Sequence, residues 1–248
     1  MFKLSSNAKE IERRLNAIAR KQVPYATSLA LNNTAKDVIK AEQDEMRRVF
    51  DRPTPFILRG LRVTKYAKKT DLQAEVGFKD VYGRSGEAVE NTLKPHIPGF
   101  PATRQPKGME RQLRRRGFLG ANEWLVPSRT LKLNQYGNIT GPLATKMLAD
   151  IGAYKGISGF DGTTKGRKAQ YIWGEVKARS GGTVKGIWKV EGGRDNYARG
   201  GWSLQMVVVK QPHYRKRFDW SGTARETFDK CYPARFDAAM DQAIATAR

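Results

Sequence analysis

Residues Pro24–Leu58 read PYATSLALNNTAKDVIKAEQDEMRRVFDRPTPFIL, and this stretch decides the fold. Its apolar residues recur at steps of three, four and seven, which is the spacing of an amphipathic helix. They are Leu31, Ala35, Val38, Ile39, Met46, Val49 and Phe50. The opposite face carries Lys36, Asp37, Lys40, Glu42, Gln43, Asp44, Glu45, Arg47 and Arg48. The pattern predicts a long helix that buries one side.

Prolines mark both ends of this helix. Pro24 suits the first helical turn, where a backbone N–H would have no partner in any case. Pro53 and Pro55 cannot donate backbone hydrogen bonds, and each pushes the preceding residue towards extended geometry. We therefore expect the helix to end near Phe50 or Asp51, with Phe50 and Phe56 on either side of the stop.

Further helices and strands follow from local patterns. Apolar residues at helical spacing predict a helix before about Lys21, short helices at 87–93, 108–117 and 141–154, and a last helix at 223–248. Pro233 should kink or split the last of these. Alternating apolar residues predict a hairpin at 59–79 and an antiparallel meander at 170–177, 183–190 and 202–210. Residues 155–168 carry four glycines without an apolar period, which predicts a flexible loop.

The order of these elements predicts the fold class. Helices and strands do not alternate as they do in a doubly wound sheet. The expected fold is α+β: long N-terminal helices and a C-terminal helix packed on one antiparallel sheet, which both strand groups share. We expect residues 1–248 to form a single domain, with 80–168 as an extended, irregular and basic insertion or arm.

The net charge of +22, with a pI near 10.2, is the outlier of the composition. Such a charge favours anionic partners, of which nucleic acid is the usual one, with acidic protein surfaces and membranes as alternatives. No apolar run is long enough for a transmembrane helix, and we expect no membrane partner. The single cysteine, Cys231, excludes an intrachain disulfide and any zinc site built from several cysteines.

The residues that usually carry catalysis are sparse and scattered. The two histidines, His96 and His213, lie in no metal-binding or nucleophilic motif. The glycine-rich segment at 155–168 lacks the spacing of a phosphate-binding loop, and the carboxylates lie mostly among basic residues. We expect no enzyme activity, no metal and no cofactor.

Basic residues gather in two segments that could contact a nucleic-acid backbone. The first set is Arg104, Lys107, Arg111, Arg114, Arg115 and Arg116, and the second is Lys165, Arg167 and Lys168. Backbone contact needs these charges on one face and would weaken steeply with salt. The alternatives are a solvated face or a patch that matches an acidic neighbouring subunit. No recognition helix or RNA-binding motif is present, so sequence-specific readout is not expected.

The stretch Pro24–Leu58 resembles the N-terminal region of tailed-bacteriophage minor tail proteins of the Z-like, tail-completion type. In that family a helix rich in Ala, Asn and Thr leads into a phenylalanine and an Arg-Pro-Thr-Pro-like stop, as at Phe50–Phe56. Similar segments are PGFPATRQPKGMERQLRRRGFL at 98–119, the turn at 136–138, KGIW at 185–188, and Tyr214, Arg217 and Phe218 before the last helix. The resemblance covers most of the chain in outline.

The resemblance implies a structural virion protein of the neck or upper tail that works as a ring of several copies. Its partners would be itself and neighbouring adaptor, tail-terminator or tube proteins. The basic residues would face genomic DNA in a channel, or acidic neighbours. The expected subunit contacts are Phe50, Arg52, Pro53, Pro55, Phe56 and Phe100. The main alternative is a non-specific nucleic-acid-binding accessory protein, and a nuclease with a cryptic site stands third.

Overall fold

The computed structural model describes residues 13, 16, 18–79, 88–152, 170–177, 182–190 and 201–246. Helices and antiparallel strands occur in separate segments of the chain, which confirms the α+β class. The chain groups into two compact units. Met1–Val81 and Lys216–Arg248 form the first, here the helical unit; the second is residues 82–215, here the sheet unit. Most of the predicted insertion at 80–168 thus belongs to the sheet unit.

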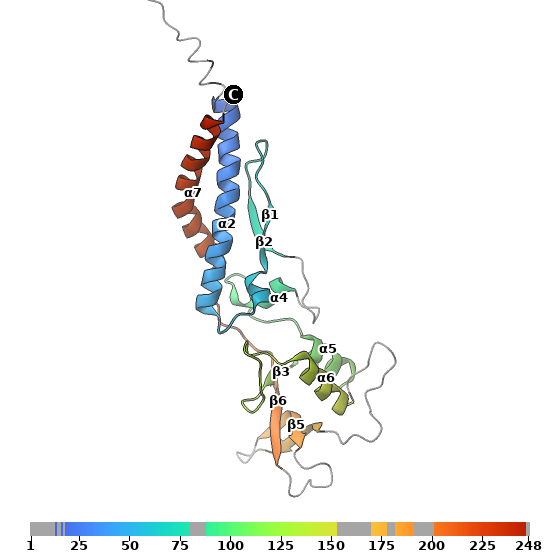
Figure 1. The fold of residues 1–248 in the computed structure, drawn as a ribbon. Coiled ribbons are helices and arrows are strands. Elements are labelled where there is room, and N and C mark those ends of the chain that lie inside the picture. The colour runs from blue at the N-terminus through green and yellow to red at the C-terminus, as the bar shows by residue number, and fades with distance from the viewer. Residues whose placement is uncertain are drawn as a thin grey trace, which may run out of the picture. The chain divides into compact units, whose positions relative to one another are not determined.

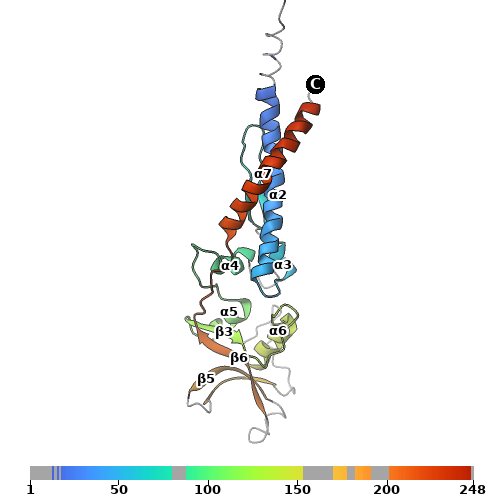
Figure 2. The ribbon, with the colours of Figure 1, turned by 90° about the vertical axis from the view of Figure 1, so that its left-hand side faces the viewer.

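Two long helices, α2 (Val23–Val49) and α7 (Trp220–Ala245), dominate the helical unit and lie side by side (Figures 1 and 2). A short π-helical segment, η1 (Ile18–Gln22), leads into α2. Phe50 follows α2 in extended geometry, with φ −103° and ψ 138°, so the predicted helix and its end are confirmed. The helix predicted before Lys21 lies largely outside the described residues.

The buried residues of α2 recur at every fourth position, more regularly than the predicted apolar face. They are Ala26, Ala30, Thr34, Val38, Glu42 and Met46, with Ser28 and Ala35 beside them. Ala35, Val38 and Met46 were expected inside, but the placement of Glu42 on the polar face is wrong, because its side chain is fully buried. The physical reason is that α2 contacts both α7 and a hairpin, so its buried surface is wider than one stripe.

Small side chains form the contact between α2 and α7. Ala26 and Ala30 pack with Ala239 and Ala243, and larger side chains flank this seam. Small residues at a helix contact allow the two backbones to approach closely. Helix α7 continues through Pro233, so of the two predicted outcomes, a kink or a split, the split does not occur.

A two-stranded hairpin packs beside α2, with β1 (Leu61–Lys65) antiparallel to β2 (Glu75–Phe78). Its turn closes through mutual backbone hydrogen bonds between Lys68 and Asp71, which confirms the hairpin predicted at 59–79. The Asn32 amide donates to the Ala67 carbonyl at 3.0 Å, and its oxygen accepts from the Ala67 N–H at 2.8 Å. The Asn32 side chain therefore forms hydrogen bonds with both backbone polar groups of the buried Ala67, as the backbone of a neighbouring strand would.

Replacing Asn32 by alanine should detach the hairpin from α2. The backbone groups of Ala67, which is 6% exposed, would lose both partners. We expect the free energy of unfolding of the helical unit to fall by about 1–3 kcal/mol, measured by denaturant titration. Amide exchange of Ala67 should also speed up. Asn33→Ala is the matched control, because no other described residue forms a hydrogen bond with the Asn33 side chain; an equal effect of both variants would contradict the assignment.

The sheet unit contains a four-stranded antiparallel sheet of order β3-β6-β5-β4. Its strands are β3 (Glu123–Pro127), β4 (Tyr171–Lys177), β5 (Thr183–Val190) and β6 (Trp202–Lys210). The three strands of the predicted meander are confirmed, whereas β3 was not predicted. The expectation that both strand groups share one sheet is wrong, because β1 and β2 pair only with each other among the described strands.

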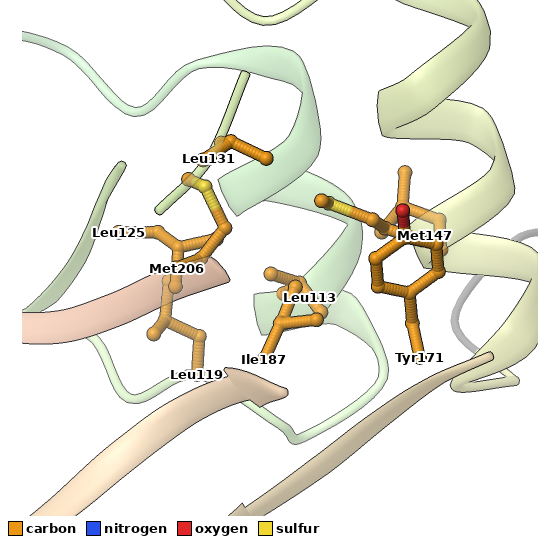
Figure 3. Packing of buried hydrophobic residues seen from close by; sticks show 9 residues of the cluster. Leu113, Leu119, Leu125, Leu131, Met147, Tyr171, Ile187 and Met206 are labelled. Atoms are coloured by element: carbon orange, nitrogen blue, oxygen red, sulfur yellow. The ribbon is translucent and has the colours of Figure 1, made fainter. Parts of the chain in front are cut away.

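Two helices supply apolar side chains to one face of this sheet: α5 (Gly108–Arg115) and α6 (Gly141–Asp150). Figure 3 shows Leu113 of α5 and Met147 of α6 packed with the sheet residues Tyr171, Ile187 and Met206. The short helices α4 (Val89–Leu93) and η2 (Lys94–His96) precede them. All three predicted short helices are therefore present.

The predicted stop of α5 is also confirmed. Gly117 adopts φ +76°, a conformation that favours glycine, and the Phe118 N–H donates to the Leu113 carbonyl at 2.9 Å. Leu113 is fully buried and Met109 packs against the core of the sheet unit. The predicted flexible loop at 155–168 lies outside the described residues.

Candidate subunit and nucleic-acid contact sites

The predicted contact segment Phe50–Phe56 is a tight connection between two helices. Arg52 has φ +50°, in the left-handed region that non-glycine residues seldom adopt. The Thr54 hydroxyl then accepts from the Ile57 N–H at 3.3 Å, and Pro55 fills the first turn of α3 (Pro55–Leu58). The segment is thus a turn fixed by backbone geometry and a helix cap.

The side chains of this turn differ in how far they reach solvent. Phe50 is half-buried and packs on the fully buried Phe218, with ring centroids 5.9 Å apart, so one side of its ring contacts the interior of the helical unit. Pro53 and Phe56 are half-buried. Arg52 and Pro55 are exposed, and the Arg52 guanidinium forms an ion pair with Asp51 at 2.9 Å. Of the five residues predicted as contacts in this turn, Arg52 and Pro55 are therefore the most accessible to solvent.

Phe100, the last predicted subunit contact, belongs to the other unit. Its ring is 40% exposed, and the Lys94 ammonium lies 5.2 Å from the ring centroid. A cation over an aromatic face is a stabilising contact even near the surface. The structure thus divides the predicted contacts between the helical unit, with five, and the sheet unit, with Phe100.

Arg104, the first residue of the predicted DNA-contacting set, is committed to the interior of the sheet unit. Its guanidinium donates to both carboxylate oxygens of Glu110, each at 2.6 Å, and the two side chains are only 9% and 3% exposed. Its Nε also donates to the Tyr214 hydroxyl at 3.0 Å. This buried bidentate pair leaves Arg104 little freedom to contact a phosphate.

Glu110 gathers two further donors. The backbone N–H of Lys107 donates to it at 2.7 Å, and that of Leu125 at 2.9 Å. Burial acts to raise the pKa of Glu110, but the hydrogen bonds from Arg104 and from these backbone groups outweigh burial and lower it. The carboxylate therefore stays ionised and joins the segment before α5, α5 itself and β3.

Arg114 is also engaged within the sheet unit. The guanidinium carbons of Arg104 and Arg114 lie 4.9 and 4.8 Å from the ring centroid of the buried Trp124. Arg114 Nη2 donates to the Glu123 carbonyl at 2.8 Å. The Trp124 ring contacts both Arg104 and Arg114, and the β3 backbone binds Arg114. Two of the six basic residues of the first predicted set are thus engaged within the unit.

The other residues of the first basic set lie closer to solvent. Lys107 and Arg111 are both exposed, and Arg111 donates to the Pro106 carbonyl at 2.7 Å. Arg115 and Arg116, at the end of α5, are exposed, and in the described part of the chain no ion pair or hydrogen bond involves their side chains. Lys165, Arg167 and Lys168 lie outside the described residues.

Positive charge is distributed unequally between the two units. Residues 82–215 hold 23 of the 46 lysines and arginines but only 9 of the 24 acidic residues. The sheet unit therefore carries most of the net charge of +22. A partner attracted by charge would approach this unit first.

The position of Glu110 in the sequence indicates the buried ion pair, whereas the clustering of basic residues does not. Glu110 is the single acid within GMERQLRRRG, and its spacing to Leu113 places it on the inward side of α5. A lone carboxylate on the apolar side of a basic helix requires a buried cation. Which arginine supplies it depends on the tertiary fold.

The described residues form neither a metal-binding cluster nor a membrane-spanning helix. Across the described ranges, no three or more histidine, cysteine, aspartate or glutamate side chains cluster in a way that could hold a metal ion. Within the same ranges, no helix is both long and apolar enough to cross a membrane.

Comparisons of the chain with protein-family models, curated proteins and solved structures find no match. The likeness to phage tail-completion proteins therefore stays a prediction from the sequence.

Proposed function

We propose that this chain is a structural protein of a tailed-bacteriophage virion, a neck or tail-completion component without enzymatic activity. It assembles as a homo-oligomeric ring at the head–tail junction or in the upper tail. Neighbouring adaptor, tail-terminator or tube proteins contact it, and its basic residues face the DNA channel.

The observation that carries this proposal is the concentration of positive charge in the sheet unit, together with the exposed pair Arg115 and Arg116. A ring around DNA needs sequence-independent attraction to phosphates, which lysine and arginine side chains supply. The engagement of Arg104 and Arg114 inside the unit narrows the proposed DNA-facing set to Lys107, Arg111, Arg115 and Arg116, with Lys165, Arg167 and Lys168 still proposed from the sequence alone.

The turn after α2 supplies the proposed subunit contact. Thr54 and Pro55 fix its shape, and Asp51, Arg52 and Pro55 are its exposed residues. A preformed turn loses little conformational freedom when it binds a neighbour, which favours its use as a contact in an assembly.

Mass spectrometry of purified virions tests the proposal. We expect the chain among the structural proteins of the intact particle in several copies per virion, and in the tail or neck fraction after the particle is dissociated. A chain that is absent from virions and stays monomeric with its candidate partner proteins would refute the proposal.

The second candidate, a free nucleic-acid-binding accessory protein, is favoured by the same charge. Binding of the purified chain to random duplex DNA at near-physiological salt, without an assembly partner, would support this candidate. Ring formation or copurification with particles would support the virion protein.

Removal of the exposed arginine pair should weaken any contact with DNA. For Arg115→Ala with Arg116→Ala we expect lower affinity for random duplex, because two phosphate contacts are lost, and the slope of log affinity against log salt should fall by about 2. Fluorescence anisotropy across a salt series measures the affinity and its salt dependence. The control is Arg47→Ala with Arg48→Ala, which removes equal charge from α2, where both arginines are paired with acidic residues. Equal losses in both double variants would show that net charge alone determines binding.

A further inference from the structure

The two outer edges of the four-stranded sheet differ in how their backbone groups are satisfied. In an antiparallel ladder, alternate residues direct N–H and C=O towards the neighbouring strand, and those between them point outward. The Val190 N–H donates to the Gln170 carbonyl at 2.8 Å, which sets this alternation between β4 and β5. The outward residues of β4 are therefore Tyr171, Trp173, Glu175 and Lys177.

The outer edge of β3 is closed by side chains and by proline. The Glu123 N–H donates to the Gly120 carbonyl at 3.2 Å, and the Glu123 carbonyl accepts from Arg114 at 2.8 Å. The Leu125 N–H donates to Glu110 at 2.9 Å, and Pro127 has no N–H. Such capping is how edge strands are kept from pairing with other chains.

Among the described residues, nothing comparable protects the outer edge of β4. At its start, the Tyr171 N–H donates to Asp150 at 3.3 Å. For the outward N–H and C=O groups of Trp173, Glu175 and Lys177, the described residues supply no hydrogen-bond partner. The strand contains no proline. An edge of this kind is a template for one more strand.

We propose that β4 pairs antiparallel with β4 of a second copy of this chain, about a two-fold axis at Gly174. This register pairs all seven residues of the strand and places Ile172 opposite Val176, Trp173 opposite Glu175, and Tyr171 opposite Lys177. It forms one continuous sheet across the two copies. The inference concerns a pair of chains and does not rest on the proposed function.

Charge favours a second copy in this register. Two chains of net charge +22 repel each other over most of their surface, but β4 carries one glutamate and one lysine and is neutral. No like charges lie directly opposite in the pairing about Gly174, whereas a pairing centred on Glu175 would oppose two carboxylates, which destabilises a sheet. Gly174 suits the axis, because nothing lies within 4 Å of a Cβ built there.

Side chains on the sheet face that points away from the α5–α6 core also complement each other in the proposed pairing. Ile172 and Val176 lie on the face opposite the α5–α6 core, where Val184 and Trp188 are their partners on β5. Opposing Ile172 with the Val176 of a second copy extends this apolar row across the axis. β-Branched pairs directly opposite each other stabilise antiparallel strands.

Disulfide trapping in the full chain tests the pairing and its register. Cys231, the only cysteine, is first replaced by serine. Gly174→Cys in this background should give a covalent dimer under mild oxidation, because Cα atoms of a non-hydrogen-bonded antiparallel pair lie about 4.5 Å apart, within disulfide reach. Non-reducing electrophoresis measures the dimer.

Val176→Cys in the same background is the matched control on the same face. In the proposed register its two copies are offset by four residues, about 13 Å, which no disulfide spans. We expect no cross-link from this variant. Equal cross-linking of both variants, cross-linking of Val176→Cys alone, or none from Gly174→Cys would overturn the proposal.

A measurement of mass completes the test. Glu175→Pro removes an outward N–H that the fold of one chain does not use, and edge strands tolerate proline. Light scattering after size exclusion should give twice the 27.9 kDa chain mass for the wild type and the single chain mass for this variant. The urea midpoint of the isolated variant and its far-ultraviolet circular dichroism should show a folded chain if the fold is intact. A wild-type chain that is monomeric at high concentration, or a Glu175→Pro variant that is folded yet dimeric, would refute the pairing.

Discussion

Replacing Arg104 by methionine is expected to lower the free energy of unfolding of the sheet unit by about 3–5 kcal/mol. Methionine fills much of the same space but leaves the Glu110 carboxylate, 3% exposed, without its bidentate partner. Two backbone N–H groups would still donate to that carboxylate, but its charge would have no counter-ion. The contact of the Arg104 guanidinium with Trp124 would also be lost.

Urea denaturation followed by tryptophan fluorescence measures this loss, because four of the five tryptophans lie within residues 82–215. Arg116→Met is the matched control: it removes an exposed arginine at the end of α5, and we expect a change within about 0.5 kcal/mol. Equal effects of the two variants would contradict the role given to the Arg104–Glu110 pair.

A double variant separates the charge from the packing. Adding Glu110→Gln to Arg104→Met removes the isolated carboxylate, so the double variant should be more stable than Arg104→Met alone. Removing both members of a buried ion pair costs less than removing one, because no unpaired charge remains. A double variant less stable than the single one would assign the effect to lost hydrogen bonds instead.

Local patterns predicted the elements of the fold well. The apolar period and the prolines at either end predicted α2 and its stop at Phe50, and alternation predicted the hairpin and the meander. These features depend on interactions within a few residues, which a sequence displays directly.

The arrangement of the elements depends on contacts that the sequence does not display. Nothing local shows whether two groups of strands share a sheet, and here β6 pairs with β3, a strand that was not predicted, instead of with the hairpin. Likewise, the arginines of residues 104–116 look alike in sequence. Arg104 is distinguished by Tyr214, which is 110 positions away along the chain.

Glu42 is the clearest example of a residue that a simple two-faced helix pattern assigns to solvent although the structure buries it. The stripe from Ala26 to Met46 repeats every four residues, and it includes alanines and Thr34, whose weak hydrophobicity gives little signal. A four-residue repeat drifts around an α-helix of 3.6 residues per turn. The buried surface of α2 therefore turns along its length and takes in a position that the apolar residues alone assign to solvent.

The burial of Glu42 leads to the second large prediction, a loss of stability of the helical unit as pH rises. Burial, followed by the nearby charges of Glu45 and Asp219, raises the pKa of Glu42 from 4.5 to about 8. Neither carboxyl oxygen has a hydrogen-bond partner among the described residues. Between these two pH values the unfolded chain releases the proton and the folded chain keeps it, so unfolding becomes easier with each pH unit by about 1.4 kcal/mol.

The stabilisation from this neutral carboxyl is fully present below pH 4.5 and is lost as the pH rises through 8, a total of about 5 kcal/mol. Glu42→Gln keeps the shape without the titrating proton, so its unfolding free energy should vary far less between about pH 5 and 9. Urea denaturation followed by far-ultraviolet circular dichroism, which reports on α2 and α7, measures both curves.

Asp44→Asn is the control for this measurement, because it removes a carboxylate that is 62% exposed and paired with Arg47 on the same helix. It should keep the wild-type dependence on pH. If Glu42→Gln also kept that dependence, the buried carboxyl would already be ionised at neutral pH. A fully buried carboxylate without a counter-ion is the costlier state, because desolvation penalises the charged form far more than the neutral one. Because Glu42 stays neutral, the net charge of the folded helical unit at pH 7 should be one unit more positive than the sum of the usual charges of its residues.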